Sequence, residues 1–101
     1  MNLIDIEIVP KIRKGEAGTI VISVPETEGL KILKIEVPSG VISPSGSSIT
    51  LAPDVKRVDI PIVVTKEAPE SVVVRFHVME KNPEKKRAVE GSTEYILKIA
   101  K

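Results

Sequence analysis

Apolar and polar residues alternate along several short segments of the sequence, a pattern typical of β-strands with one buried face. Residues 3–9 show it first, because Ile4, Ile6 and Ile8 fall on one face and acidic residues fall on the other. Proline, glycine and serine separate the alternating segments and favour turns there. The pattern predicts seven or eight strands, at residues 3–9, 19–24, 30–37, 48–52, 57–64, 72–79 and 93–100, with a short eighth at 41–42.

In the segment at residues 30–37 the alternation changes phase part-way along. Leu33 and Ile35 share the face that we expect to point inward. Leu30 and Ile32 fall on the opposite face. A β-bulge near Ile32 and Leu33 would bring both halves onto the same face, and we expect one there.

Two segments indicate their own place in a sheet. Pro61 lies within residues 57–64. Because proline has no backbone N–H, this strand should lie at a sheet edge or turn the proline nitrogen toward solvent. Residues 72–79 carry apolar side chains on both faces, which favours a central strand.

The composition favours the same fold class. Val and Ile together number 28 of 101 residues, against five Leu and five Ala, and β-branched residues favour strands over helices. A single sheet would leave one face of these aliphatic side chains in water, so a second layer has to cover it. We therefore expect an all-β fold, a two-sheet immunoglobulin- or fibronectin-like sandwich of seven or eight strands, forming one domain over residues 1–101.

Residues 43–78 contain a Leu-x-Pro step, then an alternating apolar strand, then a short Ala-Pro link. The residues that form this arrangement are Leu51, Pro53, Val58, Ile60, Ile62, Ala68 and Pro69. It resembles the middle of immunoglobulin-like accessory domains of cell-surface and secreted proteins, including the CARDB type, with Asp54 standing where those domains usually have glycine. The resemblance implies a non-catalytic interaction or spacer module, and it transfers no functional residue to this chain.

The balance of charge and the absence of cysteine exclude several classes of function. The chain has 15 basic and 14 acidic residues, a formal net charge of +1 and no cysteine, which excludes disulfides, thiolate metal sites and cysteine nucleophiles. The longest apolar runs fall far short of the ~20 residues of a membrane-spanning helix. The acidic start does not resemble a secretory signal, so we expect a cytoplasmic protein if the chain is complete and a cell-surface domain if it is a fragment. Eleven Lys, eleven Glu and no Gln favour a thermophilic source.

No group of residues in the sequence points to catalysis or to a cofactor. His77 is the single histidine, and we expect it at an ordinary outward position of a strand. Two acidic pairs, at residues 5 and 7 and at residues 26 and 28, would need further oxygen ligands to hold calcium. We therefore predict no enzyme activity, no catalytic residue, no bound metal and no cofactor.

The strongest local positive charge lies in the segment at residues 81–92. It comes from Lys81, Lys85, Lys86 and Arg87, with glutamates interspersed. Nucleic-acid binding requires a stripe of such residues and, for single strands, aromatic platforms for stacking, but the chain has only one Phe and one Tyr. We expect a solvated hairpin tip here, and binding of a nucleic acid or a phosphate ligand through this loop is the alternative function.

Apolar side chains at outward strand positions indicate a different kind of surface. Val63 and Ile96 point away from the expected core, as do Val21 and Val73. Where neighbouring strands bring such residues together they form an exposed apolar patch, and edge strands add main-chain pairing with another chain. We therefore expect a protein-interaction or structural module, in a surface assembly or a small homo-oligomer, that binds a protein partner or itself. The candidate contact residues are Lys81, Lys85, Lys86, Arg87, Val63 and Ile96.

Overall fold

The computed structural model describes residues 3–9, 11–81 and 89–100. Within these ranges the chain forms nine β-strands and no helix. The longer strands coincide with the alternating segments of the sequence, because each can bury one apolar face. The strands are β1 (Asp5–Ile8), β2 (Ile12–Arg13), β3 (Ala17–Ser23), β4 (Lys31–Glu36), β5 (Val41–Ile42), β6 (Ser48–Leu51), β7 (Arg57–Val64), β8 (Ser71–Glu80) and β9 (Glu90–Ala100).

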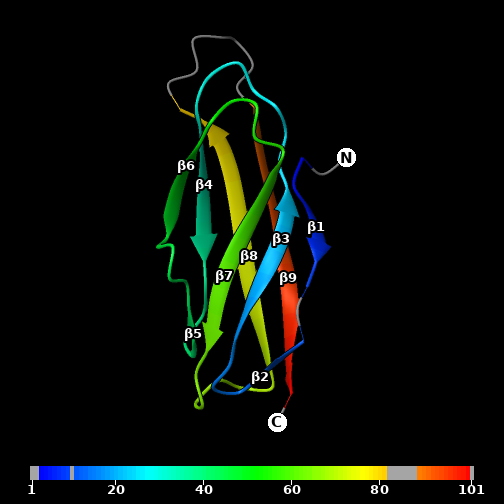
Figure 1. Cartoon of the computed structure of the whole chain (residues 1–101), viewed down its shortest axis with the longest axis vertical. Helices are drawn as coiled ribbons and strands as arrows, with labels where there is room; N and C mark the ends of the chain where they lie inside the picture. The colour runs from blue at the N-terminus through cyan, green and yellow to red at the C-terminus, as the bar shows by residue number, and fades with distance from the viewer. Residues whose placement is uncertain (1–2, 10, 82–88, 101) are drawn as a thin grey trace.

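The strands form two sheets, one in front of the other in Figure 1. One sheet has four strands in the order β1-β3-β7-β5, and the other has five in the order β2-β9-β8-β4-β6. Neighbouring strands are antiparallel except β2 and β9, which are parallel. The N-terminal part of the chain therefore supplies an edge strand to each sheet.

One cluster of buried apolar side chains lies between the two sheets. From the four-stranded sheet it takes Ile20 and Ile60, both 0% exposed. From the five-stranded sheet it takes Leu33, Phe76 and Leu97, which are also buried. The expectation of an all-β fold in two layers is confirmed, because the inward faces of both sheets are apolar and each covers the other.

Two expectations about strand positions are confirmed. Strand β8 pairs with β9 on one side and with β4 on the other, so it is central. The N–H of Val64 donates to Glu16 on the β3 side (2.9 Å), and since N–H directions alternate along a strand, the nitrogen of Pro61 faces away from β3. On that side β5 reaches only Val63 and Val64, so no described strand pairs beside the proline.

The strand count differs from the expected seven or eight because β2 is a strand as well. The short strand at residues 41–42 is present and pairs with β7. Strand β2 has only two residues, which pair with Ile99 and Ala100 of β9. A two-residue strand is too short to show alternation in the sequence. It is a strand only because it pairs with β9.

The β-bulge expected near Ile32 and Leu33 is wrong. From Lys31 to Glu36 the strand β4 keeps an unbroken register with β8, and the part that pairs with β6 is equally regular. Lys31 takes the inward position two residues before Leu33, while Ile32 lies on the outer face and Leu30 stays outside the strand, 47% exposed. The expectation failed because it assumed that apolar residues point inward and lysines outward.

The inward position assigned to Ile8 is also wrong. The register between β1 and β3 shifts between Ile6 and Ile8, so that Ile6 lies opposite Ile22 and Ile8 lies opposite Val21. An extra residue in one strand reverses the alternation beyond it. Ile8 therefore lies on the outer face and is 50% exposed.

Candidate protein-interaction surfaces

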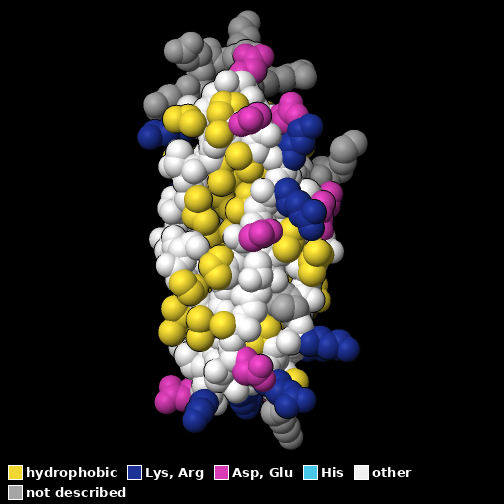
Figure 2. Space-filling view, in the orientation of Figure 1, with side chains coloured by type: hydrophobic (Ala, Val, Ile, Leu, Met, Phe, Trp, Pro, Cys, Tyr) yellow, Lys and Arg dark blue, Asp and Glu magenta, His cyan; other side chains and the backbone are white. Residues whose placement is uncertain are grey.

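The outer face of the four-stranded sheet carries a row of apolar side chains, Ile8, Ala17, Ile42, Pro61 and Val63, which we call the outer stripe. Strand register brings all of these residues except Ile8 together, and Ile8 lies further along the same face, opposite Val21. Val63 lies opposite Ala17 of β3 and opposite Ile42 of β5, and Pro61 is the next outward residue along β7. Figure 2 shows hydrophobic side chains running along this face of the molecule.

Exposure varies along the outer stripe. Ile42 is 53% exposed, and Val63 points outward as expected but is half-buried. Val21, which we expected to be exposed, faces the same side but is only 8% exposed, since it lies between Ile8 of β1 and Asp59 of β7. Among the described residues paired across the strands with the outer stripe or with Val21, Asp59 is the one charged side chain.

The outer face of the five-stranded sheet carries charged pairs along its middle strands, whereas in the four-stranded sheet the ion pair of Arg57 with Glu7 (3.0 Å) lies at the opposite end of β7 from Val63. Arg75 lies between Glu36 and Glu94 in register, and its Nε donates to the carboxylate of Glu94 at 3.0 Å. Further along β8, Nε2 of His77 lies 3.0 Å from the carboxylate of Glu90. His77 is therefore at an outward strand position, and these side chains hold one another across the strands.

Ile96 and Val73 are an apolar exception on this second face. They lie directly opposite each other on β9 and β8, and Ile96 is 59% exposed. The outward apolar residues of the sequence thus fall into two groups on different sheets. Val63 belongs to the outer stripe of the four-stranded sheet, whereas Ile96 lies on β9 of the other sheet. Alternation cannot predict this separation, because it gives the direction of a side chain and not its neighbours.

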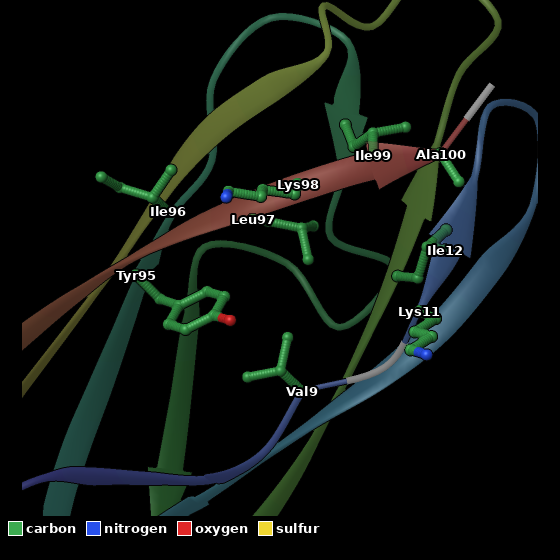
Figure 3. Close-up of a pocket in the computed structure, with 9 residues that line it drawn as sticks. All are labelled: Val9, Lys11, Ile12, Tyr95, Ile96, Leu97, Lys98, Ile99 and Ala100. Atoms are coloured by element: carbon green, nitrogen blue, oxygen red, sulfur yellow. The ribbon is translucent and has the colours of Figure 1, made fainter.

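A groove of about 580 Å³ opens between the N-terminal part of the chain and β9 (Figure 3). Val9 and Ile12 line one side of it, and Tyr95 and Leu97 line the other. Val9 and Tyr95 pack against the core but remain half-buried. The groove exists because β1 and β2 belong to different sheets, so the chain leaves β9 uncovered where it crosses from one sheet to the other.

A buried lysine that sequence reasoning missed closes one end of the space between the sheets. Lys31 is 0% exposed. Its Nζ donates to the backbone carbonyls of Pro25, Val55 (2.5 Å) and Pro53 (3.3 Å). An ammonium group has three donors, and here all three have partners. Lys31 therefore ties the loop after β3 to the loop before β7.

The surroundings of Lys31 shift several pKa values. Burial lowers the pKa of Lys31, and the negative charges of Glu26 and Asp54 partly oppose this effect. Glu26 lies at the surface, where its ion pair with Lys56 (2.7 Å) lowers the pKa of Glu26 and raises the pKa of Lys56. These groups hold the loops in place and do not converge on a cavity.

The remaining candidate residues are not brought together by the described structure. Lys85, Lys86 and Arg87 lie outside the described residues, so the basic loop stays a prediction. Lys81 is exposed, and its N–H donates to the carbonyl of Leu30 (2.7 Å). Among the residues that the structure describes, no group of three or more His, Asp or Glu could hold a metal ion, and no helix is long and apolar enough to cross a membrane.

Comparison with known proteins gives no identity for the chain. No protein family matches its sequence, and no curated protein is significantly similar to it.

Proposed function

We propose that this chain is a non-catalytic protein-interaction module with an immunoglobulin-like sandwich fold. The observation that carries the proposal is the outer stripe, where outward apolar residues from β1, β3, β5 and β7 share one face. Apolar side chains gathered on one face gain free energy when a partner removes them from water. Single exposed apolar residues are ordinary, but a row spanning several strands forms a contact surface.

The contrast with the other sheet supports this choice of surface. Both sheets need apolar inward faces to build the core, whereas their outward faces are free to differ. The five-stranded sheet uses its outward positions for ion pairs such as Arg75 with Glu94. Residues so paired are already hydrated and partnered, so the four-stranded sheet is the better candidate for binding an apolar partner surface.

The immunoglobulin-like assignment is supported by two facing sheets and by an N-terminal segment that pairs first with β3 and then with β9. It is supported further by the resemblance of residues 43–78 to accessory domains of that type. Such domains act as binding or spacer units, which agrees with a partner surface on one face and a core filled by aliphatic side chains.

The test compares two substitutions at similarly exposed positions. Ile42→Lys places a charge in the outer stripe, and Leu30→Lys places the same charge outside it, at positions 53% and 47% exposed. Each tagged variant is used to capture proteins from an extract of the source organism, with identification by mass spectrometry. We expect the wild-type chain and Leu30→Lys to retain the same partner, and Ile42→Lys to lose it.

Thermal unfolding of each variant shows that the fold is intact. Retention of the same partner by Ile42→Lys, and by Val63→Lys as a second variant in the stripe, would contradict the proposed surface. The absence of any captured protein with the wild-type chain would contradict a role in binding a heterologous partner.

A further inference from the structure

The long strand β9 has an edge that the rest of the described chain covers only at its two ends. On the β8 side β9 is paired at residues 90–98. On the opposite side, β2 pairs with residues 99 and 100, and no other described strand pairs there. Near the start of β9, a Cβ atom at Gly91 would lie 2.7 Å from Cβ of Leu3. The open part of the edge is therefore a short slot between Leu3 and β2.

Backbone groups at two positions of β9 face this slot. The N–H of Ile99 donates to the carbonyl of Glu70 on the β8 side (2.8 Å). Backbone groups alternate in direction along a strand, so those of Glu94 and Ile96 face the other way, into the slot. They have no strand partner among the described residues. Such an edge can accept another strand through main-chain hydrogen bonds.

Strand β2 shows how a strand that lies in line with it would be placed. It runs parallel to β9, with Ile12 opposite Ile99 and both side chains buried. A second parallel strand, ending before β2, has one residue opposite Tyr95 and another opposite Leu97, with both side chains on the inner face. Its backbone forms three hydrogen bonds with the open groups of β9, two from its own N–H groups and one to a carbonyl.

The groove of Figure 3 receives those two inward side chains. Its volume of about 580 Å³ lies within the range of ligand-binding pockets. Tyr95 and Leu97 line it on β9, and Val9 and Ile12 line it on the other side. Val9 and Tyr95 are half-buried, so apolar side chains placed against them remove further apolar surface from water. The groove therefore favours a strand with apolar residues at alternate positions.

The charge around the groove favours one direction for that strand. Lys11 lies in the segment that crosses between the sheets just before β2, and Lys98 lies one residue before the first pair of β9 with β2. Both are exposed, and no acidic side chain is among the described residues that line the groove. A parallel strand directs its carboxyl end toward these lysines, and β2 leaves it no room to continue. A free C-terminal carboxylate fits this end, whereas an N-terminal ammonium would face like charges.

We propose that the groove beside β9 binds the C-terminal peptide of a partner protein as a short parallel strand. The last residue of the peptide is apolar and lies opposite Leu97, and the third residue from its end is apolar and lies opposite Tyr95. The residue between them points to solvent, so its identity is less restricted. The carboxylate lies at the lysine end of the groove. This site goes beyond the proposed function, since it lies on the other sheet from the outer stripe and does not depend on it.

The test titrates the full chain into a synthetic peptide, Ser-Gly-Ser-Ile-Ser-Val, with a fluorescent group at its N-terminus, and follows the anisotropy. One control peptide has a C-terminal amide. A second exchanges the isoleucine with the serine that follows it. We expect each control to bind at least about tenfold more weakly than the free acid. The amide lacks the charge, and the exchange turns one apolar side chain toward solvent.

Charge reversal at the end of the groove tests the place of the carboxylate. We expect Lys11→Glu to weaken binding of the free acid at least about fivefold and to change the weaker binding of the amide little, because only the acid loses an attractive charge. Lys34→Glu is the matched control, since it makes the same change at an exposed position on the outer face of β4. It should bind the free acid like the wild-type chain. Thermal unfolding of both variants shows that each is folded.

Nuclear magnetic resonance tests the strand pairing and its direction. At saturating peptide, hydrogen exchange of the Ile96 amide should slow, because this N–H donates to the peptide. A nitroxide at the N-terminus of the peptide should broaden signals near Gly91. Broadening near Ile12 instead would show that the strand runs the other way and would overturn the proposal.

The other outcomes separate this site from the proposed function. Equal binding of the acid and the amide, or no binding of the acid up to about 1 mM protein, would overturn the peptide site and leave capture through the outer stripe unaffected. Ile42→Lys, in the outer stripe, should bind the peptide like the wild-type chain. If Ile42→Lys keeps the captured partner as well, only the outer stripe is contradicted.

Discussion

Backbone polar groups find their hydrogen-bond partners in different ways at the end of the fold near Lys31 and along the open edge of β9. Near Lys31, three carbonyl oxygens from two loops converge on one buried ammonium group inside the chain. Along β9, the backbone groups of residues 94 and 96 have no strand partner among the described residues and face outward. The polar groups of the first region are hydrogen-bonded within one chain, and the backbone groups of the second are not.

The difference follows from burial. A polar group removed from water must find a partner inside the protein or cost about 1–3 kcal/mol, so the closed end supplies its own donor. A polar group at an edge can bond to water in the monomer and to another chain in a complex, at little cost in either state. The carbonyl groups at the closed end are therefore satisfied within the monomer, whereas the backbone groups at residues 94 and 96 bond to solvent there.

Removal of the buried donor should have the largest effect on stability. Lys31→Ala deletes a packed side chain and leaves the three carbonyls without their cation, so we expect a loss of about 3 kcal/mol in the free energy of unfolding. Urea unfolding measures it.

Lys31→Met separates packing from hydrogen bonding, because it keeps an unbranched apolar stem but no donor. We expect it to lose about half as much as the alanine variant. A methionine variant at least as stable as the wild-type chain would show that the ammonium is not needed at this end, and the contrast between the two regions would then fail.

A smaller effect is expected where Leu3, just before β1, approaches β9. A Cβ atom at Gly91 would lie 2.7 Å from Cβ of Leu3, so Gly91→Ala forces the start of the chain away from the edge. We expect a loss of about 1 kcal/mol, measured by urea unfolding. Gly29→Ala is the matched control, since an added Cβ there meets nothing within 4 Å. Equal effects of the two substitutions would show that the contact with Leu3 does not restrain β9.

The pH dependence of stability sharpens the contrast further. Because the pKa of Lys31 is lowered by burial, the unfolded chain binds more protons than the folded chain between that lowered value and the ordinary value of 10.5. The Lys31 contribution to stability should therefore rise as pH increases through this window. Urea unfolding from pH 8 to 10.5 should show this rise in the wild-type chain relative to Lys31→Met, and parallel curves for the two would contradict it.

The smallest effect is expected for an exposed pair beside the open edge. Arg75→Ala removes the ion pair with Glu94, whose side chains are 56% and 63% exposed. Exposed pairs contribute little, so we expect a change of less than about 0.5 kcal/mol in unfolding free energy. A loss above 1 kcal/mol would show that the outer ion pairs support the sheet as much as the interior does.

Several features of the fold could be predicted from single residues. The apolar character of both faces placed β8 at the centre of its sheet, and Pro61 required an unpaired position on one side of β7. Both predictions rest on local rules that hold whatever the neighbours are. The outward direction of Val63 and Ile96 followed in the same way from alternation.

Other features depended on neighbours and could not be predicted. The inward position of Lys31 was missed because lysine is almost never fully buried, and only the meeting of two distant loops supplies its three acceptors. The reversed face of Ile8 depends on a register shift against β3. The groove beside Tyr95 exists because the chain crosses between sheets at that point.

The sequence by itself determined that the chain forms strands, which face of most strands is apolar, and that two layers must meet. These are properties of each residue and its next neighbours along the chain. Only the tertiary structure decided which outward residues become neighbours, which lysine is enclosed and which edge stays open. Those features depend on pairing between segments far apart in the sequence, and each requires the position of two strands at once.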